Sequence, residues 1–536
     1  MKARFFFAAM AALAIVGCNK DVNEGPAAAA DGTTSLVSVK LKATGTMSKA
    51  FEYGSEEENA IQSATFYFFD ADGAAYEVAE GTNAVEVTAT ELTRNEGENA
   101  ENIEAFSEVI LVLKSHKAVP PAQMVALINA GDYSNKTLAE LEAAATELET
   151  EAGFVMSNSV YEGDQGVVTA TQILPENIFV DPSLEGEVGD VYEGTVEVEP
   201  VVIYVERVAA KVRVNAETNE NGLIPVEGVD NTFVEILGWE VTNTTATSHL
   251  IKKYAETELF TPFNNAAFFR SYWAASHADA EAIHGLTFDD IVNELGAEAY
   301  YHENTLEQAA IAEGWVNDVD KAGEDDENGE GIQAAQLIVA AKLVDANGEP
   351  REFAKWYGVD YENGDALKAT MINNAAKQIY VKAADNTYTG ITIDDVTFYQ
   401  IDDQTSYYEE GWNGDFRYEV RVMATEGTQY YNAKAEEMSA DDVNAILNKI
   451  EPAMIWAGGN TYYFTLINHF GVAKGIVRNH IYDINITSIK GLGTPVYNPD
   501  MYITPEIPNE QDGFHLTAQI NVLSWNVVSQ DVELGF

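Results

Sequence analysis

Apolar and polar residues alternate with a period of two in several stretches of the chain. Near the N-terminus, Val37, Val39 and Leu41 are separated by single polar residues. The same alternation, or a short apolar run that ends at turn residues, occurs in segments 63–73, 108–113, 201–214, 460–470 and 480–489. A period of two places successive side chains on opposite faces of a strand, so these stretches predict β-strands.

The last stretch of the chain, about residues 514–536, has the same pattern. Its apolar positions are Leu516, Ala518, Ile520 and Val522, followed in a shifted register by Trp525, Val527, Val532 and Leu534. A β-bulge or a bend allows such a shift. The chain therefore carries an amphipathic strand near each end.

Helical signals are few and short. Thr137 and Glu140 form a capping box in front of an apolar stripe, which predicts a helix over 138–148. Ser439 opens a second capped helix.

An acidic, glycine-bearing linker at 181–194 separates two strand-rich parts of the chain, which places a domain boundary near residue 195. We therefore predict a mainly β fold with two β-sandwich-like (transthyretin-like) domains, 50–195 and 196–536. Short helices accompany the strands, and long inserts lie in the second domain, among them 255–330.

The first seventeen residues have the pattern of a bacterial lipoprotein signal peptide. Lys2 and Arg4 precede an apolar run, 5–16, that is too short to span a bilayer and suits a secretory signal. Residues 15–18, Ile-Val-Gly-Cys, match the lipobox. In that motif the cysteine, here Cys18, receives a diacylglycerol and becomes the mature N-terminus. A plain signal peptide followed by a chance cysteine is the alternative.

Cys18 is the only cysteine among 536 residues. Once it is lipidated, no thiol is left for a disulfide, a metal site or a nucleophile. No other apolar run has the length of a transmembrane helix, so the lipid is the expected membrane attachment. The small polar residues 19–34 are typical of a flexible tether.

Composition and motifs argue against nucleic-acid binding and against catalysis. The chain has 87 acidic and 30 basic residues. The resulting net charge of −57 repels nucleic acid and anionic lipid. The chain lacks the HExxH, GxSxG, P-loop and Rossmann patterns. The acidic stretches at Asp70 and Asp345 predict turns rather than calcium loops, because the later ligand positions are not filled. We expect no enzyme activity, cofactor or metal.

Several longer segments, in order along the chain, carry a family resemblance. They are the lipobox with "CNKDVNEGP", "SVKLKATGTMSKAF", "FVMSNSV", "VERVAAKVRV", "ILGWEVTNTTATSHLIKKY", "YYFTLINHFG", "VRNHIYDINITSIKGLGTP" and "INVLSWNVVSQDVEL". Together they resemble the fimbrillins of Bacteroidales, the pilins of type V pili, and most closely the major subunit of the short (minor) fimbriae. The resemblance implies a surface fimbria that serves adhesion and biofilm formation.

The resemblance also implies a route of assembly. Such pilins reach the outer membrane as lipoproteins, carrying acyl chains such as palmitate, and a trypsin-like protease cuts them after a basic residue. The matching residue here is Lys49, followed by Ala50, so the cut would remove a propeptide, 18–49, with its tether and first strand. Family members cut by an arginine-specific enzyme carry arginine at this position, so the lysine leaves the identity of the protease open.

In the family, the groove left by the first strand is filled by the C-terminal strand of the next subunit. The resemblance therefore makes Val37, Val39 and Leu41 the removed strand and about 514–536 the donor strand. The implied partners are identical subunits in a head-to-tail polymer, anchor and tip accessory pilins, and the processing protease. The adhesion ligand is not specified by the sequence.

Two alternatives stay open beside the shaft subunit. The chain could be a tip or anchor subunit of the same pilus. It could also be a monomeric, lipid-anchored protein that binds glycans with some of its 26 tyrosines and 7 tryptophans as stacking platforms.

Overall fold

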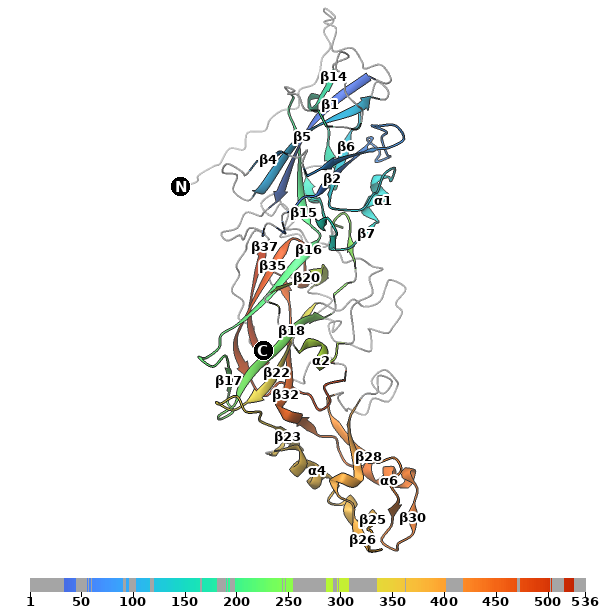
Figure 1. Ribbon diagram of the computed structural model, residues 1–536, viewed down its shortest axis with the longest axis vertical. Helices are drawn as coiled ribbons and strands as arrows, with labels where there is room; N and C mark the ends of the chain where they lie inside the picture. The colour runs from blue at the N-terminus through green and yellow to red at the C-terminus, as the bar shows by residue number, and fades with distance from the viewer. Residues whose placement is uncertain are drawn as a thin grey trace, which may run out of the picture.

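In the computed structural model the protein is elongated and mainly β, as the sequence predicts, with several antiparallel sheets and a few short helices (Figure 1). It describes residues 33–44, 55–89, 93–95, 103–115, 120–180, 189–192, 198–253, 286–307, 335–401, 418–503 and 515–524, with short gaps inside several of these ranges. Three bodies follow one another along the long axis: a first β domain, a second β domain and a smaller lobe.

The first β domain is built on one large sheet with the strand order β3-β2-β6-β10-β15-β1-β5-β4. Its strands are β1 (Thr33–Thr44), β2 (Ser63–Phe69), β3 (Ala84–Thr88), β4 (Thr93–Asn95), β5 (Ile103–Ser115), β6 (Gln123–Ile128), β10 (Met156–Asn158) and β15 (Val201–Arg207). Two short strands, β13 (Thr171–Gln172) and β14 (Ile178–Val180), pair with β6 and β1. Neighbours along this sheet are antiparallel except β1 and β15, which are parallel.

Both faces of this sheet are packed. Val37, Phe66, Leu111 and Ile203 are fully buried on one face, as alternation along their strands requires. On the other face, alternate residues of β2 and β6 pack with Leu141 of α1 (Leu138–Glu142).

Helix α1 confirms the predicted cap but not the predicted length. The Thr137 hydroxyl accepts the backbone N–H of Glu140, and the Glu140 carboxylate accepts the backbone N–H of Thr137. The helix ends at Glu142 instead of 148, because the next residues form the short strands β7 (Ala145–Thr146) and β8 (Glu149–Thr150). The pairing of β7 with distant Ser248 and His249, and of β8 with the nearby segment 153–154, overrides the local helical pattern.

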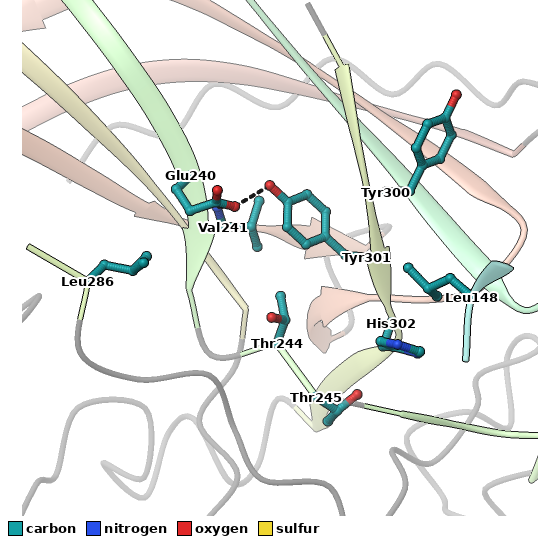
Figure 2. Close-up of a pocket in the computed structure, with 9 residues that line it drawn as sticks. All are labelled: Leu148, Glu240, Val241, Thr244, Thr245, Leu286, Tyr300, Tyr301 and His302. Atoms are coloured by element: carbon teal, nitrogen blue, oxygen red, sulfur yellow. Dashed lines mark hydrogen bonds between the residues drawn. The ribbon is translucent and has the colours of Figure 1, made fainter. Parts of the chain in front are cut away.

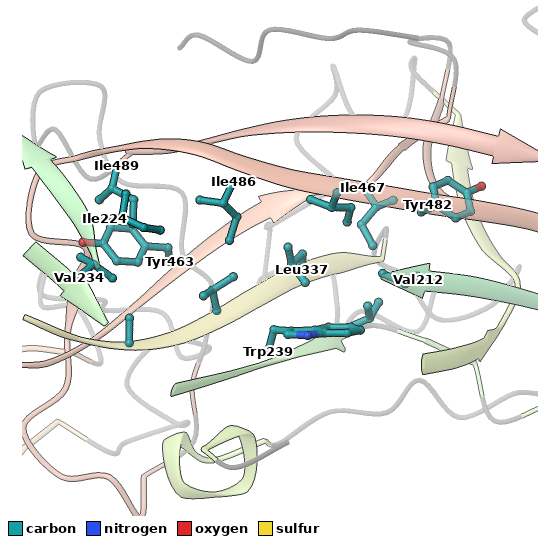
Figure 3. Packing of buried hydrophobic residues seen from close by; sticks show 14 of the residues in the cluster. Val212, Ile224, Val234, Trp239, Leu337, Tyr463, Ile467, Tyr482, Ile486 and Ile489 are labelled. Atoms are coloured by element: carbon teal, nitrogen blue, oxygen red, sulfur yellow. The ribbon is translucent and has the colours of Figure 1, made fainter. Parts of the chain in front are cut away.

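The second β domain has the strand order β20-β16-β35-β17-β18-β22-β32-β36, with β37 on β35. Its strands are β16 (Ala209–Ala216), β17 (Ile224–Glu227), β18 (Phe233–Thr242), β20 (Glu298–His302), β22 (Gln336–Val344), β32 (Asn460–Leu466), β35 (His480–Lys490), β36 (Thr494–Pro495) and β37 (His515–Ser524). Strand β17 pairs with β35 at one edge and with β18 at the other, and so joins two sheets. Between them lies a core that contains Ile486 and Ile489 of β35, Leu337 of β22 and Trp239 of β18 (Figure 3).

The chain passes from the first sheet to the second at Val208, between β15 and β16. This is later than the boundary expected near residue 195. The reason is that the apolar segment 201–214, continuous in sequence, is divided between the two domains.

Long inserts were expected in the second domain, and the segment between β22 and β32 folds as the third body. It contains α4 (Gly364–Ile372), α6 (Ala440–Leu447) and short strands from β23 (Phe353–Trp356) to β31 (Met454–Trp456). Ser439 caps α6 as predicted, because its hydroxyl accepts the backbone N–H of Asp442. Most of the other expected insert, 255–330, lies outside the described residues.

Candidate assembly site

Strand β1 lies in the interior of the first sheet. It pairs along its length with antiparallel β5, and on its other side with antiparallel β14 and then parallel β15. Val37 is opposite Leu111 and Ile178, and Val39 is opposite Val109 and Val201. The backbone of β1 therefore has hydrogen-bonded strand neighbours on both sides.

The side chains that the sequence assigns to this strand are packed in the domain core. Val37 and Val39 are 0% exposed and belong to a cluster with residues of β2, β5, β6 and β15. Leu41 pairs with Ser107 and Ile203, and its side chain is outside the described set. Without β1, facing edges of β5 and β15 would lack their partner, and Leu111 and Ile203 would lose packing.

The expected lipidation and cleavage residues lie outside the described residues. This holds for Cys18 and for Lys49 and Ala50, which fall between the end of β1 and Ser55. Because β1 is followed by that segment, a single cut there would separate 1–49 from the rest of the covalent chain.

The expected donor segment forms β37 on the edge of the second domain. Leu516 is opposite Ile489, Ile520 is opposite Ile484, and Val522 is opposite Tyr482. Ala518 is opposite Ile486, and the register shifts next to it, between Ile486 and Ser488 of β35. In the described part of the chain, β35 is the one strand that pairs with β37.

The side chains of β37 are not described, and Trp525, Val527, Val532 and Leu534 lie beyond it, outside the described residues. The backbone nevertheless shows how this strand is held. It lies at a sheet edge, so it could leave β35 without parting two other strands of the domain.

A cavity of about 440 Å³ lies near the junction of the two β domains (Figure 2). The Tyr301 hydroxyl donates to the Glu240 carboxylate, whereas Tyr300 points away from it and donates its hydroxyl to Glu58. Both hydroxyls are thus engaged within the protein. Burial lowers the pKa of His302, at the same cavity, to about 4.

Asp70 and Asp345 stabilise turns, as predicted. The Asp70 carboxylate accepts the backbone N–H groups of Asp72 and Ala74, and the Asp345 carboxylate accepts those of Asn347 and Glu349. No cluster of three or more His, Cys, Asp or Glu side chains suited to a metal occurs among the described residues. Within the same part of the chain, no helix has the length and apolar character needed to cross a membrane.

The comparison with known families concerns the end of the second domain. Residues 455–531 match the model of the major fimbrial subunit protein type IV, fimbrillin, C-terminal region. Over this region the chain is similar to the fimbrillins. The matched segment runs from β31 through β32 and β35 and includes all of β37.

No curated protein matches this sequence. Among solved structures, a protein described as a cell adhesion protein from Bacteroides eggerthii has 9% identity and a TM-score of 0.35, over 93% of this chain and 98% of that one. Another so described, from Parabacteroides distasonis, has 14% identity and a TM-score of 0.35, over 93% and 99%. The tip fimbrial protein of Porphyromonas gingivalis has 10% identity and a TM-score of 0.29, over 91% and 100%. At TM-scores this low, the likeness to these structures carries no conclusion about the role of this protein.

The sequence predicts the two terminal strands, β1 and β37, but not which strands pair with them. The segments 108–113 and 201–214 were predicted as strands, yet nothing local indicates that they flank β1. Glu58, which is 3% exposed and contacts the second domain, was not predicted. Its signal in the sequence is weak, because it is one glutamate in an acidic run.

Proposed function

We propose that this protein is a fimbrillin, the shaft subunit of a surface fimbria, and that it polymerises by strand exchange, serving adhesion and biofilm formation. The observation that carries the proposal is the position of β1. It is an interior strand, paired on both sides, but the segment after Thr44 is its covalent link to the domain that surrounds it.

The first step of the proposed pathway is processing at the outer membrane. The precursor is lipidated at Cys18 and cut after Lys49 by a trypsin-like protease. The cut makes β1 a noncovalently held strand, whose departure opens a slot between β5 on one side and β14 and β15 on the other. Unpaired backbone groups and apolar side chains along such a slot are costly in water, so the slot favours another strand.

The second step is insertion of the C-terminal strand of the next subunit. Strand β37 and the residues behind it, about 514–536, supply this donor. Burying four to six apolar side chains contributes on the order of 10 kcal/mol before ordering costs, at roughly 1.5–3 kcal/mol each. Because the lipidated segment has been cut away, the exchange is irreversible. Anchor and tip pilins would end the polymer, and the adhesion ligand is not assigned.

The experiment is the N-terminal sequence and intact mass of protein sheared from the cell surface, with an unboiled gel of the same sample. We expect a chain from Ala50 to Phe536 and a ladder of polymers. Lys49→Gln should leave a longer, unpolymerised chain, whereas Lys434→Gln, on the exposed surface of the distal lobe, should not. A single band that begins at lipidated Cys18 would overturn the proposal in favour of an anchored monomer.

A further inference from the structure

The two β domains are joined by more than the main chain at Val208. A segment of the second domain, residues 248–252, returns to the first domain; we call it the strap. Its strand β19 (Ser248–His249) pairs with β7 of the first domain. Leu250 and Ile251, which are 0% and 1% exposed, belong to the core cluster that also contains Leu127.

The strap ends in a buried ion pair. The Lys252 ammonium lies 2.9 Å from a carboxylate oxygen of Glu206, the penultimate residue of β15, and both residues are 1% exposed. The Ser159 hydroxyl donates to the same carboxylate at 3.2 Å. A buried charge without its partner is strongly unfavourable, so this pair holds the strap against β15.

A second contact comes from Glu58, which we call the anchor. Its carboxylate accepts hydrogen bonds from the Lys211 ammonium at 2.9 Å and from the Tyr300 hydroxyl at 2.6 Å. Both donors belong to the second domain. The backbone oxygen of Glu58 accepts Nε of Arg207, the last residue of β15. Burial alone would raise the pKa of Glu58, but the hydrogen bonds from Tyr300 and Lys211 outweigh it and keep the pKa below its ordinary value.

A third contact is the loop before β35. Arg478 Nε lies 3.0 Å and 3.1 Å from the two carboxylate oxygens of Glu303, and its Nη2 donates to the backbone oxygen of His249 in the strap. The backbone N–H of Asn479 donates to the backbone oxygen of Ala209, just beyond Val208, and its side-chain oxygen accepts the backbone N–H of Arg207, in β15 of the first domain, at 3.4 Å. All three contacts therefore lie around Val208, where the main chain passes from the first domain to the second.

Domains joined by one crossing normally move relative to each other unless their interface is large and apolar. Here, buried charges and a packed strap occupy the junction, and opening it would leave buried charges without their partners, which is costly. We infer that the strap, the anchor and the loop before β35 fix the two β domains as one rigid body and brace β15, a wall of the proposed slot, after β1 is removed. The bracing of the open slot rests on the proposed function, whereas the rigidity of the joint does not.

Single-molecule fluorescence energy transfer tests the rigidity. Because the chain has one cysteine, Cys18→Ser allows dyes at Asp72→Cys in the first domain and Glu220→Cys in the second, both on exposed residues. The full-length chain should give one narrow distance distribution, which stays narrow after a cut that releases 1–49. Glu58→Ala should widen the distribution at least twofold. Glu227→Ala, which removes a surface carboxylate 4.0 Å from the Lys490 ammonium, is the matched control and should not.

Trypsin accessibility gives an independent reading of the same joint. Lys211 and Lys252 are 5% and 1% exposed, so cleavage after them should be slow and should speed up at least tenfold in Glu58→Ala. Cleavage after exposed Lys434 in the distal lobe should not change, which separates an opened joint from a misfolded chain. If Glu58→Ala fails to fold, Tyr300→Phe removes one hydroxyl from the anchor and should speed cleavage after Lys211 severalfold.

A broad distribution in the unsubstituted chain, or a narrow one in a folded Glu58→Ala chain, would overturn the inference. So would a distribution that broadens as soon as 1–49 is released, since β15 would then not be braced. These measurements use monomers, so a chain that keeps a rigid joint but never polymerises would contradict the proposed function and leave the joint standing.

Discussion

At the residue scale, two kinds of buried side chain determine the stability of this protein and how that stability changes with pH. The valines of β1 are apolar and fully buried, so they hold a strand that the proposed pathway later removes. The histidines and charged residues near the domain junction are also buried, but their contribution depends on protonation. The buried valines predict how shortening their side chains changes the free energy of unfolding, and the buried titratable residues predict how that free energy changes with pH.

Val39→Ala should destabilise the uncut chain by roughly 1.5–3 kcal/mol, because a fully buried valine loses most of its apolar contact. Urea unfolding of the first domain, followed by a local probe, measures the change. Val359→Ala, at a position that is 54% exposed in the distal lobe, is the control and should change stability by less than about 0.5 kcal/mol. Equal effects at the two positions would contradict the interior placement of β1.

Acidification should destabilise the fold between pH 7 and pH 5. Burial lowers the pKa of His302 and of His480 to about 4, so between 6.5 and 4 the unfolded chain binds more protons than the folded one. Each histidine then costs on the order of 2 kcal/mol at pH 5 relative to pH 7. Burial raises the pKa of Glu206, which acts in the opposite sense, so the histidine contribution is measured by comparing chains with and without His480.

The measurement is the free energy of unfolding at both pH values, in the unsubstituted chain and in His480→Gln. The substitution removes one titrating histidine, so the loss on acidification should become smaller by on the order of 2 kcal/mol. Exposed Lys434→Gln should leave the pH dependence unchanged. A loss of the same size in His480→Gln would show that His480 does not become protonated on unfolding.

At the element scale, the two terminal strands have different surroundings. Strand β1 is an interior strand, whereas β37 lies at an edge and pairs with β35 among the described strands. An interior strand contributes to the domain core and cannot be altered without consequence. An edge strand can leave its sheet, which is what the proposed exchange requires of a donor.

Ile520→Asp should therefore separate assembly from export. A charge at an apolar position of the donor would be buried in the slot of the next subunit, so polymers on an unboiled gel should fall at least tenfold. The amount of exported chain should stay within about twofold, because the position lies on an edge strand. Gln519→Asp, at the neighbouring polar position, should still polymerise, and equal loss in both variants would argue against an alternating donor.

At the scale of the whole molecule, the proposed assembly brings together copies of an elongated chain whose net charge is −57. Like charges slow the approach of such copies, and salt screens them. The Debye length falls from about 30 Å at 0.01 M salt to about 8 Å at 0.15 M. Because strand insertion requires close approach, the rate of assembly depends on this screening.

Polymerisation of the cut protein should therefore speed up severalfold when salt is raised from about 0.01 M to 0.15 M. Light scattering at fixed protein concentration measures the rate, with the intact precursor as a control that stays monomeric at both salt concentrations. A rate that falls with salt would mean that attraction between charged patches, rather than net repulsion, controls the encounter.

The sequence by itself determined the local features of this protein. Alternation at Val37 and Val39 and at 515–524 predicted the strands, and Thr137 and Ser439 predicted the helix caps. These features depend on side chains within a few residues of one another, so a single sequence is enough to read them.

Tertiary structure alone decided which strands became neighbours. It placed β1 between β5 and β15, ended α1 at Glu142, moved the change of domain to Val208 and brought Glu58 against Lys211. Each of these outcomes depends on contacts between residues far apart in sequence, and the period of two says which face of a strand is buried but not which strand lies beside it. The polar joint was hidden for the same reason, since Glu58 and Lys252 acquire their partners only when the two domains meet.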